Sequence, residues 1–511
     1  MKDQFIKEFT EKYTFKGEEI ILGKAKLDNE VVPEAKVSVP LKMMNRHGLI
    51  AGATGTGKTK SLQLLAENLS KHGVPSLLMD IKGDLSGIAK PGDASNPKIQ
   101  ERHELLQLPY EAMGFPVELL SLSQEKGVKL KATVTEFGPI LFSKILSLNE
   151  TQTGVMSLVF KFCDDKQLPL VDLKDVRKVL QYLTEDEGQA EISKEYGAVS
   201  SASVGAILRN IVSLEQQGAD TFFGEPSFDV EDLMQTVDGL GKINVLRLTD
   251  IQDKPALFST FMLSLLSEVY GTLPEEGDLD KPKLCIFIDE AHLIFQEASK
   301  ELLNQIETVI KLIRSKGVGI FFCTQVPGDV PDDVLSQLGL KIQHALRGFT
   351  AKDKKEIDKA VENYPVTEYY DASKLIGELG IGEAFVTALN EKGIPTPLAH
   401  TYMIAPASRM DILTDSEIND LVAESDLVQK YNKEVDKETA YEMLTAKMER
   451  SAEAQAESEE EKRAVKEQSA RRKEEPSIFE TIMKNPTVKS MGNTFMRTLT
   501  RQLFGSMFKG K

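Results

Sequence analysis

From residue 46 onward, short apolar runs alternate with longer stretches that have helical spacing. Several of these runs are apolar throughout, which is typical of strands buried on both faces of a sheet. Regular alternation of strands and helices predicts an α/β fold with a mostly parallel sheet. The expected strands are HGLIAG (47–52), PSLLMDIKG (75–83), PVELLSL (116–122), INVLRL (243–248), KLCIFIDE (283–290), VGIFFCTQ (318–325), KIQHALR (341–347) and GEAFVTAL (382–389).

The polar and apolar positions outside this pattern divide the chain into further regions. Residues 1–45 contain EEIILGKAKL and AKVSVPL, whose alternation at period two predicts a small β region of short strands and turns. Residues 46–406 are expected to form the α/β core, with a helical insertion at about 137–235 where helical spacing replaces the strand pattern. Residues 407–475 are predicted to be a charged helical segment, and residues 476–511 a basic amphipathic tail.

Composition and charge narrow the class of protein. The 511 residues carry a net charge of −17, which gives no overall signature of nucleic-acid binding but leaves a local basic channel open. The three cysteines have no metal-binding spacing, which favours a reducing compartment. The first residues lack the apolar stretch of a signal peptide, and no apolar run reaches the ~18 residues of a membrane span. We therefore expect a cytoplasmic protein without integral membrane insertion.

A glycine-rich segment follows the first strand of the core and precedes a helical pattern. Its sequence fits G-x-x-x-x-G-K-[ST], the phosphate-binding P-loop, in the strand–loop–helix context that the motif requires. Backbone N–H groups and the helix N-terminus would surround the phosphates of ATP. Lys58 would contact the β- and γ-phosphates, and Thr59 would bind Mg²⁺. The segment consists of Gly52, Ala53, Thr54, Gly55, Thr56, Gly57, Lys58 and Thr59.

Two acids end a later buried strand, KLCIFIDEAHLIF. Asp289 is placed to hold the Mg²⁺ shell, and Glu290 to orient and deprotonate a water molecule. The alternative for Glu290 is a helix cap, since acids favour helix starts. Combined with the P-loop, a base for water favours hydrolysis over phosphoryl transfer, and the absence of an NKxD segment favours ATP over GTP.

Two further polar residues flank the strand VGIFFCTQ. Gln325 ends it, and its amide either senses the γ-phosphate or makes an ordinary strand-end hydrogen bond. Arg314 lies just before it, and is either an arginine that reaches a neighbouring subunit's γ-phosphate or part of a surface salt bridge. The sequence pattern alone leaves both choices open.

Four segments in combination resemble the HerA/FtsK superfamily of P-loop ATPases, over about residues 15–406. They are NRHGLIAGATGTGKT, LMDIKGDLSG, FIDEAHLIF and RSKGVGIFFCTQVPGDVPDDVLSQ. Three more segments, DIKGDLSGIAKPG, QHALRGFTAKD and GEAFVTALNEKGIPTP, are similar to its YjgR-like bacterial branch.

The resemblance implies a RecA-like core that assembles as a ring, commonly a hexamer, with ATP between subunits. It also implies that Glu290 is the catalytic base, Gln325 the sensor and Arg314 the trans-acting arginine finger. Arg46, just before the P-loop strand, matches an arginine that recurs in HerA-like proteins and is given a supporting role.

The resemblance also implies polar residues near the nucleotide after the second core strand, where this chain has Asp80 and Asp84. The alternative for both is that they cap a loop.

The leading hypothesis is therefore a ring-forming, Mg²⁺-dependent ATPase that moves double-stranded DNA, as HerA-like helicases and translocases do. Its pore would need cations for the DNA phosphates, for which Lys82, Lys341 and Lys352 are candidates. The alternative is a regulatory or assembly ATPase that acts on a protein partner without DNA. The tail after residue 480 is expected to dock on the ring rather than to lie on an anionic membrane.

Overall fold

The computed structural model describes residues 1–277, 279–297, 300–348, 350–433, 435 and 437–474. The chain divides into two units, Met1–Tyr441 and Glu442–Lys511. The basic tail and the expected boundary at residue 476 lie outside the described residues. Among the described residues, no helix has both the length and the apolar character needed to cross a membrane.

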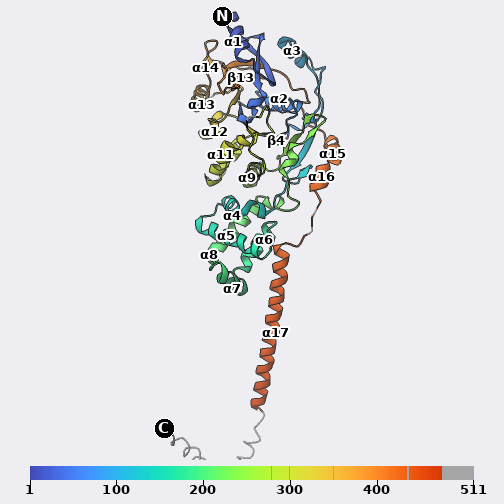
Figure 1. Ribbon diagram of the computed structural model, residues 1–511, viewed down its shortest axis with the longest axis vertical. Helices are drawn as coiled ribbons and strands as arrows, with labels where there is room; N and C mark the ends of the chain where they lie inside the picture. The colour runs from blue at the N-terminus through green and yellow to red at the C-terminus, as the bar shows by residue number, and fades with distance from the viewer. Residues whose placement is uncertain (278, 298–299, 349, 434, 436, 475–511) are drawn as a thin grey trace, which may run out of the picture. The chain divides into compact units, whose positions relative to one another are not determined.

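A mixed sheet of twelve strands is the centre of the first unit, with the order β2-β1-β14-β13-β12-β3-β11-β10-β4-β9-β5-β6 (Figure 1). From β12 to β6 all neighbouring strands are parallel, and from β12 to β2 all are antiparallel. The strands are β1 (Glu19–Leu27), β2 (Glu30–Pro40), β3 (Gly48–Ala51), β4 (Ser76–Asp80), β5 (Val117–Ser121), β6 (Val128–Lys129), β9 (Ile243–Arg247), β10 (Leu284–Ile288), β11 (Val318–Thr324), β12 (Leu340–Gln343), β13 (Glu383–Thr387) and β14 (Ala399–Met403). A separate hairpin pairs β7 (Thr236–Val237) with β8 (Leu240–Gly241).

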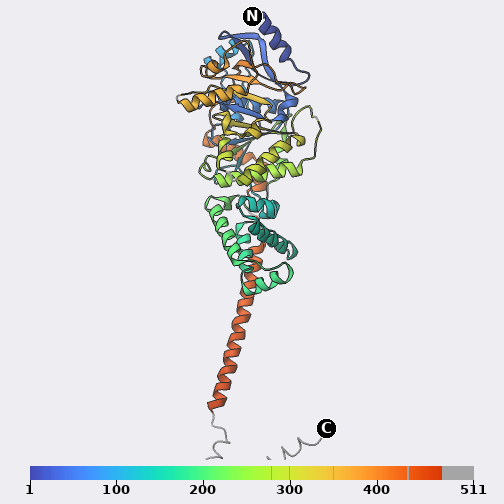
Figure 2. The ribbon, with the colours of Figure 1, turned by 90° about the vertical axis from the view of Figure 1, so that its left-hand side faces the viewer.

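Helices connect these strands, as the sequence pattern predicted. They are α1 (Lys2–Lys12), α2 (Lys58–Lys71), α3 (Pro97–Leu106), α4 (Val134–Ile145), α5 (Glu150–Asp165), α6 (Leu173–Tyr182), α7 (Asp186–Glu195), α8 (Ser201–Gln216), α9 (Pro255–Thr272), α10 (His292–Glu297), α11 (Lys300–Ile313), α12 (Asp332–Leu335), α13 (Ala351–Glu362), α14 (Ala372–Leu375), α15 (Asp415–Glu424), α16 (Asp426–Tyr431) and α17 (Ala440–Glu474). The insertion α4–α8 gathers into a helical cluster beside the sheet, which both views show (Figures 1 and 2).

All eight expected core strands are present, and several of them were continuous apolar runs in the sequence. Strands β3, β4, β10 and β11 are buried at every position. This burial on both faces is what the uninterrupted apolar runs predicted. The mostly parallel α/β fold with its helical insertion is therefore confirmed.

The expectation for the first residues was partly wrong, because residues 2–12 form a helix rather than strands and turns. Phe5 and Phe9 are buried on one side of α1, with Tyr13 just after its end, and the three aromatic rings pack in series. Their four-residue spacing places them on one helix face. The β1–β2 hairpin that follows joins the large sheet through β14.

Candidate active site

The P-loop connects the buried strand β3 to the helix α2. Two of its glycines adopt left-handed backbone conformations that other residues reach only with strain: Gly55 at the exposed tip has φ 77°, and Gly57 before the helix has φ 118°. The loop is tied to the sheet on both sides of β3, because Gly52 N donates to Thr324 O at 3.2 Å and Ala53 N donates to Ala345 O at 2.8 Å. The local sequence thus forms the loop that the motif predicted.

Lys58 is the first residue of α2, and its ammonium turns back into the loop. Its Nζ donates to Gly52 O at 2.6 Å and to Ala53 O at 3.2 Å. Burial, together with the nearby charge of Lys82, lowers the pKa of Lys58, and Asp289 and Glu290 partly oppose this shift. The structure therefore brings the P-loop lysine into one electrostatic cluster with both predicted acids.

Asp289 and Glu290 follow the last residue of β10, and both side chains are almost fully buried, at 3% and 7% exposure. Asp289 Oδ2 has no hydrogen-bond partner, whereas Glu290 Oε2 lies 3.3 Å from His292 Nδ1. Glu290 also has φ 48°, a conformation that costs energy in a residue with a side chain. Buried oxygens without partners are expensive unless something else binds them, so this pair is suited to hold a cation or a water molecule.

Lys82 is a site residue that the sequence did not identify, since it was expected in a DNA pore. Its ammonium forms an ion pair with Glu290 Oε1. Burial lowers the pKa of Lys82, but the charges of Asp289 and Glu290 outweigh burial and raise it overall. On Glu290 burial raises the pKa, and the hydrogen bond and charge of Lys82 outweigh it, so the pKa falls below its usual value. Glu290 is therefore held as a carboxylate.

Burial is the main influence on Asp289, and it raises the pKa of this carboxyl to about 6. Lys82 opposes the shift and the neighbouring Glu290 adds to it. The two acids thus differ, with Glu290 ionised beside its lysine and Asp289 poised to ionise fully when a cation approaches.

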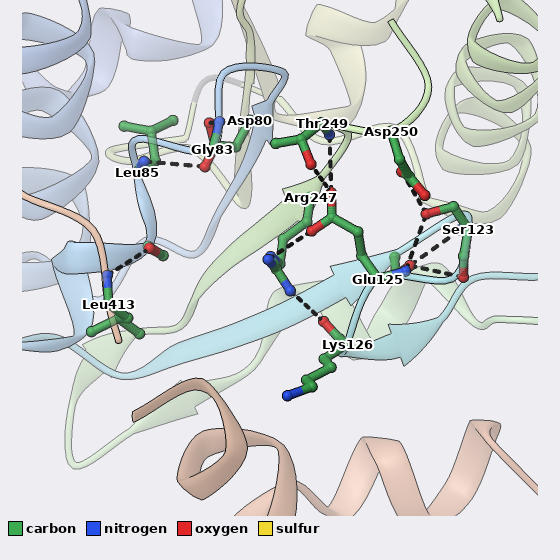
Figure 3. Close-up of polar contacts among 12 residues, drawn as sticks. Asp80, Gly83, Leu85, Ser123, Glu125, Lys126, Arg247, Thr249, Asp250 and Leu413 are labelled. Carbon is green, nitrogen blue, oxygen red and sulfur yellow. Dashed lines mark hydrogen bonds and ion pairs between the residues drawn. The ribbon is translucent and has the colours of Figure 1, made fainter. Parts of the chain in front are cut away.

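Asp80 caps the loop that carries Lys82. Its carboxylate accepts hydrogen bonds from the backbone N–H groups of Gly83 (2.7 Å), Asp84 (3.1 Å) and Leu85 (3.1 Å), as Figure 3 shows for two of them. Burial raises the pKa of Asp80 to about 7 against these hydrogen bonds. Asp80 therefore caps this loop, which was the alternative to a position near the nucleotide. Asp84, on the same loop, has one buried oxygen, Oδ1, without a hydrogen-bond partner.

A second polar network supports the other side of this loop (Figure 3). Glu125, in the loop after β5, forms an ion pair with Arg247 at 2.7 Å and accepts from Thr249 N at 3.1 Å. Arg247 also donates to Lys126 O at 3.2 Å. A Cβ built on Gly83 would lie 2.8 Å from Thr249 Cγ2, so the Lys82 loop rests directly against this network.

Gln325 follows β11, the strand between the P-loop strand and the strand that ends before Asp289. Its side chain is exposed, while the preceding Thr324 is buried and bonded through its hydroxyl to Asp329. The sequence therefore placed Gln325 correctly at the carboxyl edge of the sheet, next to the loop and the acids.

Arg314 lies at the amino ends of the parallel strands, whereas the P-loop and the two acids lie at their carboxyl ends. It is exposed in a short 3₁₀ turn (Arg314–Lys316) before β11, and the seven residues of that strand span roughly 20 Å. Arg46 also precedes its strand, β3, at this amino edge. The P-loop of the same chain is therefore out of reach of Arg314.

Of the remaining cation candidates for a DNA pore, Lys341 alone has a side chain that the structure describes. Lys341 lies on β12 and donates to Asn363 O at 3.3 Å, and the side chain of Lys352 lies outside the described residues. Lys82 belongs to the site described above.

The oxygen donors near the P-loop suit a Mg²⁺ ion that also binds phosphates and water. Among the described residues, no group of three or more His, Cys, Asp and Glu side chains could hold a metal alone. Mg²⁺ usually takes one or two protein oxygens and completes its shell with phosphates and water. The partnerless Asp289 Oδ2 and the hydroxyl of Thr59, at the start of α2, are oxygen donors of this kind.

The fold and this arrangement define a P-loop ATPase-type α/β domain. A sequence model of the family "Helicase HerA-like C-terminal" matches residues 25–511, and the chain belongs to this family.

Individual relatives agree with that assignment. The chain is 21% identical over 378 residues to "DNA double-strand break repair helicase HerA" of Sulfolobus acidocaldarius, covering 73% of this chain and 68% of the relative. It is 25% identical over 392 residues to "Probable helicase MJECL08" of Methanocaldococcus jannaschii, covering 72% and 68%. Among solved structures, the bacterial conjugative coupling protein TrwBdeltaN70 matches with a TM-score of 0.50 and 14% identity, covering 80% of this chain and 95% of that one. This last likeness concerns the fold alone.

Proposed function

We propose that the protein is a Mg²⁺-dependent ATP hydrolase of HerA-like type, in the YjgR-like bacterial branch, that works as a ring on double-stranded DNA. The observation that carries the ATPase assignment is the carboxylate pair Asp289–Glu290, which is buried beside Lys58 and leaves Asp289 Oδ2 without a hydrogen-bond partner.

The geometry of the P-loop supports the roles that we propose for its residues. Its backbone N–H groups and the start of α2 surround the phosphates, and Lys58 leaves the loop carbonyls to pair with them. Thr59 and Asp289 hold Mg²⁺, which neutralises phosphate charge when bound.

Hydrolysis itself is assigned to Glu290, which accepts the proton of the water that attacks the γ-phosphate. Gln325, at the neighbouring strand end, positions that water. Lys82 is a positioning residue: its ion pair holds the Glu290 carboxylate ionised and in place.

The ring is supported by the position of Arg314. An arginine finger stabilises charge on the transferred phosphoryl group and must reach it. Because Arg314 is exposed about 20 Å from its own P-loop edge, it can serve only a site on another copy of the chain. A closed ring gives every site such a neighbour, and a hexamer is the number we propose.

DNA as the track is supported by the similarity to HerA of Sulfolobus acidocaldarius, which is named as a DNA double-strand break repair helicase. The net charge of −17 means that DNA contact must come from local cations that line the channel. Such binding would weaken steeply with salt. A cytoplasmic location agrees with this role.

The test is steady-state ATP hydrolysis by the purified protein, with and without double-stranded DNA, beside Glu290→Gln. We expect hydrolysis, a higher rate with DNA that salt suppresses, and a loss of at least about 100-fold in the variant. The matched control is Glu362→Gln, an exposed acid on α13. Hydrolysis that DNA leaves unchanged would keep the chemistry and favour the ATPase that acts on a protein partner.

A further inference from the structure

An exposed isoleucine stands beside the P-loop on a loop that is otherwise tightly held. Ile381 is 74% exposed between α14 and β13. The next residue, Gly382, donates its N–H to Thr56 O of the P-loop at 3.1 Å. Single exposed apolar residues are common on protein surfaces, so exposure alone means little. The way in which this loop is held distinguishes it.

One arginine, Arg102, holds the backbone of the loop that carries Ile381. Arg102 donates to Ile381 O at 3.1 Å, to Gly382 O at 3.2 Å and to Met403 O at 2.9 Å. Its guanidinium lies over the ring of Tyr402, 4.0 Å from the centroid. A Cβ on Gly382 would come within 3.0 Å of the guanidinium, and its φ is +73°, so only glycine lets the loop sit this close.

A buried ion network fixes the other end of the loop. One carboxylate oxygen of Glu383, Oε1, accepts a hydrogen bond from Lys26 Nζ at 2.6 Å. The other, Oε2, accepts from Gly380 N at 3.1 Å and lies 2.9 Å from His400 Nε2. The backbone carbonyl oxygen of Glu383 lies 2.9 Å from His344 Nδ1. The second ring nitrogen, His344 Nε2, lies 2.9 Å from Ser61 Oγ on α2. The loop is thus rigidly coupled to the P-loop helix.

The strand order indicates what this loop faces. The acids that act on the γ-phosphate follow β10, which lies on one side of the P-loop strand β3, beyond β11. The loop with Ile381 precedes β13, which lies on the other side of β3, beyond β12. A triphosphate whose γ-end points toward Glu290 therefore directs its ribose and base away from β10, toward the side where Ile381 stands.

We infer that Ile381 is an apolar platform for the nucleobase of the bound nucleotide, held in place by Arg102 and Glu383. This inference rests on the proposed function, since it needs a nucleotide in the P-loop. The faces of a purine are flat and weakly hydrated, and an aliphatic side chain covers them by dispersion and by removal of water. The backbone of Ile381 is already fixed before a nucleotide binds, so placing its side chain against a base costs little additional ordering.

Binding of two probes tests the inference. ATP carries a base, whereas inorganic tripolyphosphate presents the same row of phosphates without ribose or base. Dissociation constants for both, in Mg²⁺, are measured by calorimetry on wild type, Ile381→Ala and Ile394→Ala. Ile394 is the matched control, because it is 56% exposed in the turn after β13, at the far end of that strand.

We expect Ile381→Ala to weaken ATP binding about tenfold and to leave tripolyphosphate binding unchanged, while Ile394→Ala changes neither. Equal ATP affinity in wild type and Ile381→Ala would overturn the inference alone. A change in oligomer size with ATP affinity intact would also overturn it and assign Ile381 to a contact between copies. Wild type that binds neither probe would overturn the proposed function and this inference together.

Discussion

Lys82 and Glu290 form an ion pair that joins the loop after β4 directly to the end of β10. The glutamate is almost fully buried and the lysine is about one third exposed. Lys82 lowers the pKa of the adjacent Asp289 and Glu290 raises it, so the lysine offsets part of the repulsion between the two carboxylates.

This relationship predicts a coupling between Lys82 and Glu290 in the stability of the nucleotide-free protein. We expect Lys82→Met to lower the free energy of unfolding by about 1–2 kcal/mol, because the buried Glu290 carboxylate loses its main cationic partner. Adding Glu290→Gln should recover about 1 kcal/mol. Urea unfolding of the two single variants and the double variant measures the coupling, with the exposed Lys392→Met as the control. Additive effects would show that the pair contributes nothing.

Asp289→Asn should act on the dependence of hydrolysis on Mg²⁺. Replacing one carboxylate oxygen by an amide nitrogen removes charge and one of the few oxygen ligands that the protein supplies. We expect the Mg²⁺ concentration for half-maximal hydrolysis to rise at least about tenfold, and ATP binding in EDTA to change little. An unaltered Mg²⁺ requirement would remove Asp289 from the metal site.

The position of Arg314 predicts complementation between two inactive variants. Arg314→Ala and Glu290→Gln should each abolish most hydrolysis when pure. In mixed rings, a site with an intact Glu290 can face a neighbour with an intact Arg314, so activity should partly return on mixing.

The control for this experiment is Lys316→Ala, which alters the same short turn. Full activity of pure Arg314→Ala would return this residue to the surface salt-bridge role. Mixed rings without any activity would exclude action between subunits.

The network around Glu383 predicts a specific acid sensitivity. Burial raises the pKa of Glu383, but its bonds to His400, Lys26 and Gly380 N outweigh burial and bring the pKa down to about 2. A carboxyl whose pKa is lower in the folded state stabilises the protein above its ordinary pKa of about 4.5, and this stabilisation disappears as the pH falls toward 2.

We therefore expect Glu383→Gln to cost up to about 3 kcal/mol at neutral pH, and the difference from wild type to shrink between pH 5 and pH 2. Urea unfolding across this pH range measures both quantities. Glu378→Gln, an exposed acid on the same segment, should show no such trend. A difference that is constant with pH would mean that Glu383 acts through packing alone.

The sequence allowed the positions of candidate site residues at the ends of single strands to be predicted. The P-loop, Asp289–Glu290 and Gln325 each follow an apolar run, and in a parallel sheet such positions meet at one edge. The ion pair of Lys82 with Glu290 could not be predicted in this way, because it depends on β4 lying beside β10. About 200 residues separate these two strands in the sequence. Neighbours in a sheet are chosen by long-range packing, which a local pattern does not contain.

Strand β14 and helix α1 were missed for a related reason. The strand has the polar sequence AHTYM, in which His400 and Thr401 are buried only because Glu383 and neighbouring strands satisfy them. Helix α1 precedes the segments EEIILGKAKL and AKVSVPL, which alternate at period two. Residues 1–45 were therefore predicted as one β region, and the helical spacing of the aromatic residues in α1 was overlooked. In both cases tertiary partners decided what the local sequence left ambiguous.

The pairing of β1 with β14 has a consequence for how the protein is made. Ala25 lies opposite Thr401, so these partners leave the ribosome 376 residues apart. At ordinary rates of translation, the β1–β2 hairpin waits roughly 20 to 75 s for the strand that completes it. An isolated hairpin is marginal in water and exposes an unpaired edge. The β1–β2 hairpin is therefore synthesised early and completed late, and its β1 edge lacks its native partner during most of the time that translation takes.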